Sequence, residues 1–202
     1  MKTTLSLALS LFICTTAYSQ NTWIVDQSGA GDFTEIQLAI DSLSVVDGDE
    51  VVVKDGTYFE HINFNQKEIL LRSENGAATT IIDGGGSGDV VSIINGEQAP
   101  TELRGFTVTN GGRGVHCYNY TNVFINECTI SNNLNGGVRV TENCDVQVDS
   151  TTIIGNKNSV DYGSGIHLSG SSMSISNSVI ASNSEGGPVS NYTVHRGGGI
   201  YA

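Results

Sequence analysis

The sequence predicts an all-β fold, a single-stranded parallel solenoid of stacked coils with an amphipathic helix that caps its amino-terminal end. Three observations predict this fold. The chain of 202 residues has 25 Gly, 2 Pro and 15% charged residues, too much glycine and too little charge for a helical bundle. A pattern of apolar residues and asparagines repeats in the second half. A helical period of 3.6 residues occurs in only one short segment.

Residues 1–19 have the pattern of a secretory signal peptide. Lys2 supplies the basic start, residues 5–13 are apolar, and Ala17-Tyr18-Ser19 is a small-x-small cleavage site. We therefore expect cleavage after Ser19 and a secreted or cell-surface protein. A lipid-anchored form through Cys14 is the alternative, which the bulky residue before it disfavours. No later apolar run reaches the roughly 18 to 20 residues of a membrane span.

The expected amino-terminal segment, residues 20–48, holds a strand and the helix. Thr34 and Gln37 have the spacing of a capping box, and Phe33 and Leu38 that of a hydrophobic staple. An apolar stripe at helical spacing consists of Ile36, Ala39, Ile40 and Leu43. We expect this helix to cover the first coil, because an open coil would expose apolar core and unpaired strand edges.

The expected solenoid occupies residues 49–202. Two apolar residues and an asparagine recur at internal spacings of five and three, as Ile125, Ile130 and Asn133, then Val148, Ile153 and Asn156, then Ile175, Ile180 and Asn183. The steps between these units are 23 and 27 residues, as in coils of constant cross-section interrupted by loops. Less regular coils are expected over residues 51–53, 62–64, 69–71, 81–82, 90–93 and 103–108. We also expect the stack to continue past Ala202 or to meet a capping partner there.

Alternation along each strand predicts which side chains are buried. A turn glycine precedes each strand, at Gly114, Gly137, Gly165 and Gly199. The predicted inward rows are Val115, Val138, Ile166 and Ile200, and then Cys117, Val140, Leu168 and Ala202. The turn asparagines Asn133, Asn156 and Asn183 are expected to stack as an amide ladder.

After removal of the signal peptide the cysteines are Cys117, Cys128 and Cys144. An odd number of cysteines cannot form a complete disulfide framework, and their spacing does not fit a zinc site. We expect Cys117 to be a small buried residue. No metal site or cofactor is predicted, and calcium stays open as an alternative that no clear row of outward acids supports.

Several motifs resemble the opening of pectin lyase-like right-handed parallel β-helix proteins, especially that of pectin methylesterases. They are Gly29-Ala30-Gly31-Asp32-Phe33-Thr34-Glu35-Ile36-Gln37, Val51-Val52-Val53-Lys54-Asp55-Gly56-Thr57-Tyr58 and Ile81-Ile82-Asp83-Gly84. Gly198-Gly199-Ile200 is also similar to repeats of polymorphic outer-membrane autotransporters. The resemblance implies a right-handed β-helix. The esterases carry their catalytic aspartates in Gln-Ala-Val-Ala and Asp-Phe-Ile-Phe-Gly strings, neither of which occurs here.

One outward row is predicted to bind a ligand: His116, Arg139, His167 and Tyr201, one residue per coil. Adjacent coils lie about 4.8 Å apart, so the two histidines would be about 10 Å apart with the arginine between them. Arginine suits carboxylate or sulfate groups, and histidine can transfer a proton near neutral pH. Three interpretations remain open: an ordinary solvated surface, binding without catalysis, and catalysis. The loop over residues 184–198, with Tyr192, His195 and Arg196, is expected to flank this row.

The charge balance narrows the partners. With 9 Lys and Arg against 21 Asp and Glu, the net charge of −12 excludes nucleic acid as the expected ligand. Two functions are predicted. The first is a secreted or surface β-helix module that binds extracellular polysaccharide or cell-surface glycan, or mediates adhesion. The second is a carbohydrate-active enzyme, a polysaccharide lyase or pectinesterase-like protein, that acts on an anionic polysaccharide.

Overall fold

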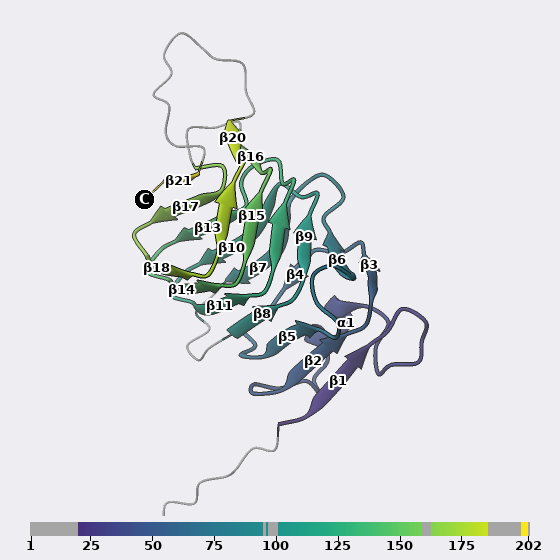
Figure 1. Ribbon diagram of the computed structural model, residues 1–202. Helices are drawn as coiled ribbons and strands as arrows, with labels where there is room; N and C mark the ends of the chain where they lie inside the picture. The colour runs from purple at the N-terminus through teal and green to yellow at the C-terminus, as the bar shows by residue number, and fades with distance from the viewer. Residues whose placement is uncertain (1–19, 95, 97–100, 159–162, 186–198, 202) are drawn as a thin grey trace, which may run out of the picture.

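The protein is a parallel β-solenoid built from three sheets, and the predicted fold class is confirmed (Figure 1). The computed structural model describes residues 20–94, 96, 101–158, 163–185 and 199–201. Every paired strand in this part of the chain runs parallel to its neighbours. The predicted signal peptide and most of the predicted loop 184–198 lie outside the described residues.

The strands of each sheet come from successive coils. Sheet A contains β1 (Thr22–Val25), β2 (Glu50–Val53), β5 (Leu70–Ser73), β8 (Thr101–Arg104), β11 (Asn122–Asn126), β14 (Asp145–Asp149) and β18 (Ser172–Ser176). Sheet B contains β3 (Gly56–Tyr58), β6 (Thr80–Asp83), β9 (Thr107–Thr109), β12 (Thr129–Ser131), β15 (Thr152–Ile154) and β19 (Val179–Ala181). Sheet C contains β4 (Ile62–Asn63), β7 (Asp89–Ile94), β10 (Arg113–Tyr118), β13 (Val138–Thr141), β17 (Ile166–Ser169) and β21 (Ile200–Tyr201). A separate strand pair joins β16 (Lys157–Asn158) to β20 (Ser184–Glu185).

The core is the inside of the coils, where inward residues of the three sheets meet. The predicted inward residues Val115, Val138 and Ile166 are buried and paired in register, as are Cys117 and Val140. Leu168 pairs with Val140 and is partly buried against the same core. The assignment of Ile200 as buried is wrong, because Ile200 lies on the last strand of the described stack and is 49% exposed. Ala202 lies outside the described residues.

The turn asparagines form the predicted amide ladder. The backbone N–H and the side-chain amide of Asn133 both donate to Oδ1 of Asn156 at 3.0 Å. Asn156 makes the same two bonds to Oδ1 of Asn183, also at 3.0 Å. Each side-chain amide donates as well to a backbone carbonyl of the preceding coil. The ladder therefore supplies partners for buried polar groups at the corner between sheets B and C.

The three cysteines Cys117, Cys128 and Cys144 are buried thiols, and Cys128 lies in a stack of its own. The Cys128 N–H donates to the Thr151 hydroxyl, and the Thr151 N–H donates to the Ser178 hydroxyl, at 3.2 and 3.1 Å. Burial raises the pKa of the Cys128 thiol to about 12. This thiol therefore occupies the position at which the next two coils carry a hydroxyl group. Its role is to fill space in the closed interior.

The predicted helix is present as α1 (Ile36–Asp41), and its residues Ile36, Ala39 and Ile40 are buried. Leu43 was expected on the same face but lies beyond the end of the helix and is 96% exposed. That α1 covers the first coil remains a prediction.

The predicted capping box of α1 is wrong. The N-cap residue is Glu35, which makes no side-chain capping bond. The carboxylate of Glu60 instead accepts the N–H groups of Ile36 and Gln37, at 2.9 and 2.8 Å. The side chain of Gln37 bonds the backbone of Asn63 on β4. Residues more than 20 positions away therefore satisfy this helix end, which a local motif could not reveal.

Candidate functional site

The predicted ligand-binding residues occupy neighbouring positions on the strands of sheet C. His116 on β10 pairs with Arg139 on β13, which pairs with His167 on β17, which pairs with Tyr201 on β21. The row is therefore continuous across four coils, with the spacing of adjacent parallel strands. The side chain of Tyr201 lies outside what the structure describes.

The row is less solvated than predicted. His116 and Arg139 are partly exposed, but His167 is only 6% exposed. Burial, and then the positive charge of Arg139, hold the pKa of His167 below its ordinary value of 6.5. An uncharged imidazole between two coils is thus the favoured form at neutral pH.

The lowered pKa of His167 predicts a stability change with pH. Below pH 6.5 the unfolded chain takes up a proton at this residue that the folded chain does not, so the folded state loses stability as the pH falls through the folded-state pKa. Above pH 6.5 the uncharged His167 makes its full contribution to the stability of the folded state. The melting temperature should fall between pH 7 and pH 5, and it should fall less in a His167→Gln variant. An equal fall in melting temperature between pH 7 and pH 5 in the wild-type protein and the variant would contradict this prediction.

A charged cluster that sequence analysis missed lies beside the row. Arg113 Nη2 bonds Asp89 Oδ2 at 2.9 Å, and Arg113 Nε bonds the other carboxylate oxygen. His116 Nδ1 lies 2.9 Å from Asp89 Oδ2. Burial acts to raise the pKa of Asp89, but the bonds from His116 and Arg113 outweigh it, so this pKa is lowered. Asp89 is therefore a carboxylate at neutral pH and fixes the orientation of both partners.

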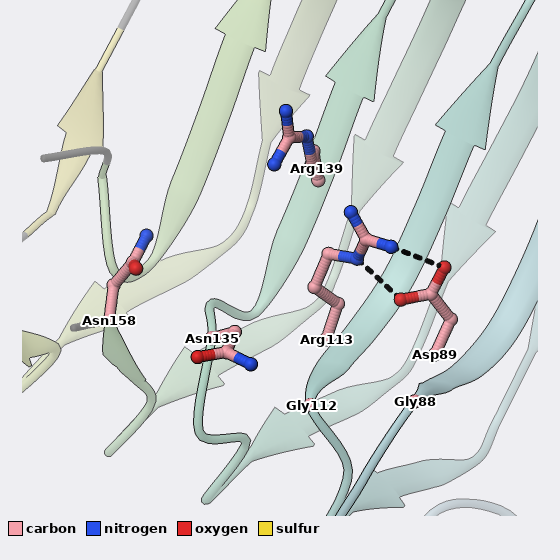
Figure 2. A pocket seen from close by; sticks show the side chains of 7 residues that line it. All are labelled: Gly88, Asp89, Gly112, Arg113, Asn135, Arg139 and Asn158. Carbon is pink, nitrogen blue, oxygen red and sulfur yellow. Dashed lines mark hydrogen bonds and ion pairs between the residues drawn. The ribbon is translucent and has the colours of Figure 1, made fainter. Parts of the chain in front are cut away.

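Two open hollows flank Arg139, one toward each end of the strands. We call the first the Asp89 hollow. It has a volume of about 360 Å³ and is lined by Gly88, Asp89, Gly112, Arg113, Asn135, Arg139 and Asn158 (Figure 2). The second, the Tyr118 hollow, has a volume of about 550 Å³ and is lined by Tyr118, Arg139, Thr141, Glu142, Asn143, His167, Ser169 and Gly170. Both volumes are in the range of small-molecule sites.

Arg139 lines both hollows. Figure 2 shows its side chain and that of Arg113 on adjacent strands, with Asn135 nearby. The Asp89 carboxylate holds the side chain of Arg113 in place. The side chain of Arg139 contributes to the polar lining of both hollows. A planar donor in this position suits a carboxylate or sulfate group of a ligand.

Tyr118 adds an aromatic surface that the sequence prediction did not include. Its side chain is 37% exposed, and its ring centroid lies 5.9 Å from that of His116. An accessible ring beside hydroxyl and amide groups offers an apolar face and hydrogen bonds together. Tyr118 lies two residues after His116, so alternation along β10 could have placed both on the outer side.

Further findings concern metals and membranes. Among the described residues, His, Cys, Asp and Glu side chains nowhere gather in a group of three or more that suits a metal ion. None of the helices in the described part of the chain is long and apolar enough to span a membrane.

Comparisons with known proteins give three findings. The sequence profile described as "right handed beta helix region" matches residues 61–201. A cell surface glycoprotein of Methanothermus fervidus is 33% identical over 101 residues, which are 50% of this chain and 15% of that protein. The chain thus spans a small part of that relative.

The third finding is a solved structure. A crystal structure of a pectin methylesterase mutant with a bound hexasaccharide is 13% identical, with a TM-score of 0.30 over 77% of this chain and 67% of the other. The family profile, by contrast, covers well over half of the chain and agrees with the three parallel sheets and their coil-to-coil register. The chain therefore belongs to the right-handed beta helix family.

Proposed function

We propose that this protein is a secreted or cell-surface module that binds extracellular polysaccharide, or supports adhesion, through the outer side of sheet C. The observation that carries the proposal is the position of Arg139, which lines two polar hollows on either side of the outward row. Tyr118 provides an aromatic face at one end, and Asn135 an amide at the other. Together these groups match the hydroxyl, ring and acidic groups of a polysaccharide.

The charge of the whole chain makes this surface distinctive. The protein carries a net charge of −12, yet Arg139 lies on sheet C beside Arg113, whose charge is balanced by Asp89. An acidic polymer is repelled by most of such a molecule and is attracted only where cations are concentrated. The similarity to a cell surface glycoprotein supports a surface location for this activity.

Arg139→Ala tests the proposal. Loss of the guanidinium should weaken binding of an acidic polysaccharide at least about tenfold, corresponding to about 1.4 kcal/mol, as measured by titration calorimetry. Lys157→Ala, a change of the same charge at an exposed residue of β16, serves as the control. Unchanged affinity in Arg139→Ala, or an equal loss in both variants, would contradict the proposal.

A second function is a carbohydrate-active enzyme that acts on an anionic polysaccharide. The bond between His116 Nδ1 and Asp89 favours it, because the carboxylate orients the imidazole and directs the other ring nitrogen to exchange a proton. A lyase would release an unsaturated uronate that absorbs ultraviolet light. Rising absorbance with uronate polymers, with or without calcium, that His116→Gln abolishes would establish this function. Binding without product supports the first function.

A further inference from the structure

We propose that the sheet C surface selects polysaccharides whose acidic sugars stand singly between neutral sugars, rather than polymers with an acidic group on every ring. This inference rests on the proposed function and specifies its ligand. The geometry points to it because Arg139 is shared by the two hollows, and the lining of each hollow also includes one carboxylate, Asp89 or Glu142.

The Asp89 hollow offers little net attraction to a second acidic group. Its lining includes two guanidinium groups and one carboxylate, and both oxygens of that carboxylate are bonded to Arg113. The Asp89–Arg113 pair is therefore neutral as a unit. The rest of the lining is glycine backbone and the amides of Asn135 and Asn158, groups that suit sugar hydroxyls.

The Tyr118 hollow is also unsuited to a second acidic group. Its charged lining residues are Arg139 and Glu142, whose side chain is exposed. Its remaining polar lining includes hydroxyl groups and the amide of Asn143, and Tyr118 contributes an aromatic face. A ring without charge can stack on this face and bond the hydroxyls, whereas a carboxylate there would be repelled by Glu142.

A linear polymer laid along the strands would cross the Asp89 hollow, Arg139 and the Tyr118 hollow in turn. One acidic group at the centre would meet Arg139, and its neighbours on both sides would meet Asp89 or Glu142. A homopolymer of uronates places carboxylates at all three positions, so one of them meets the neutral Asp89–Arg113 pair and another is repelled by Glu142. A heteropolymer with isolated uronates places neutral rings at the two outer positions.

The other titratable groups of this surface are His116 from β10, His167 from β17 and His61, whose Nδ1 lies 2.7 Å from the Asp89 carbonyl oxygen. Protonated histidines would add positive charge and attract homopolymers as well. The comparison is therefore made at pH 8, to minimise any contribution of histidine protonation, and at low salt, where screening is weak.

The test compares three ligands by titration calorimetry: deacylated gellan, in which glucuronate is flanked by neutral sugars, polygalacturonate, and neutral dextran. The wild-type protein should bind gellan at least about tenfold more tightly than polygalacturonate. Glu142→Gln and Asp89→Asn should each narrow this ratio severalfold by strengthening the binding of polygalacturonate. Asp145→Asn, the same charge change at an exposed residue of sheet A, should leave the ratio unchanged.

The outcomes separate this inference from the proposed function. Binding of polygalacturonate as tight as that of gellan overturns the inference and leaves polysaccharide binding intact. If Glu142→Gln leaves the ratio of the affinities for gellan and polygalacturonate unchanged, the inference is also overturned. This result stands even if the Asp89→Asn variant does not fold. Absence of binding to all three polymers overturns both the inference and the proposed function.

Discussion

Replacing Asn156 with alanine should lower the free energy of unfolding by about 3 kcal/mol. Its side-chain oxygen accepts two bonds from Asn133, and its amide donates to the Ile130 carbonyl at 2.9 Å. Asn156 is fully buried, so the substitution removes these bonds from the Asn133 N–H and the Ile130 carbonyl, and leaves the Asn133 side-chain amide with its bond to the Val108 carbonyl. Each buried group that loses its partner costs about 1 to 3 kcal/mol, although relaxation and entering water recover part of the sum.

Thermal unfolding measures this effect. For a chain of this size, 3 kcal/mol corresponds to a fall in melting temperature of about 6–12 °C. Asn135→Ala is the control, because Asn135 lies in the corresponding turn of the preceding coil but is exposed and is not part of the ladder. A similar melting temperature for both variants would show that the ladder does not hold the coils together.

Replacing Gly114 with alanine should have the other large effect. A Cβ at this position would lie 2.6 Å from the Gly137 carbonyl oxygen, 2.6 Å from Ile130 Cγ2 and 2.8 Å from Asn133 Nδ2. All three distances are shorter than a real Cβ contact, and the first atom is backbone of the next coil. The coils must separate locally, at an expected cost of about 1 to 3 kcal/mol, with disruption of the ladder at Asn133 in addition.

The matched control for Gly114→Ala is Gly199→Ala. Gly199 has the same place in the repeat, before a strand of sheet C, but an added Cβ there meets no atom of the described residues within 4 Å. Chemical denaturation of both variants should therefore show a lower midpoint for Gly114→Ala alone. A comparable loss in both would mean that the contact between coils is not the cause.

The second half of the fold was predictable because its repeat fixes the register. The steps of 23 and 27 residues between the asparagines are the separations across which Asn133, Asn156 and Asn183 bond one another. The series of turn glycines Gly114, Gly137 and Gly165 likewise placed His116, Arg139 and His167 in one row. The burial of His167 could not be predicted, because it depends on how closely neighbouring coils cover it and not on alternation.

The first half was less predictable because its coils vary in length. Asp89 and Arg113 are paired residues of adjacent coils, but no repeated motif in the sequence relates their positions. The cap of α1 by Glu60 likewise comes from a distant segment. As a result, the sequence predicted Arg139 as a candidate binding residue but did not predict the carboxylates that line the two hollows with it.

A crystal structure of the protein with an acidic oligosaccharide bound would test directly whether sheet C binds polysaccharide through Arg139. The proposed function predicts that the sugar lies on the outer side of sheet C, with its acidic group on the guanidinium of Arg139 and neighbouring rings in the Asp89 and Tyr118 hollows. A sugar bound on sheet A or sheet B, with Arg139 in contact with solvent alone, would contradict it.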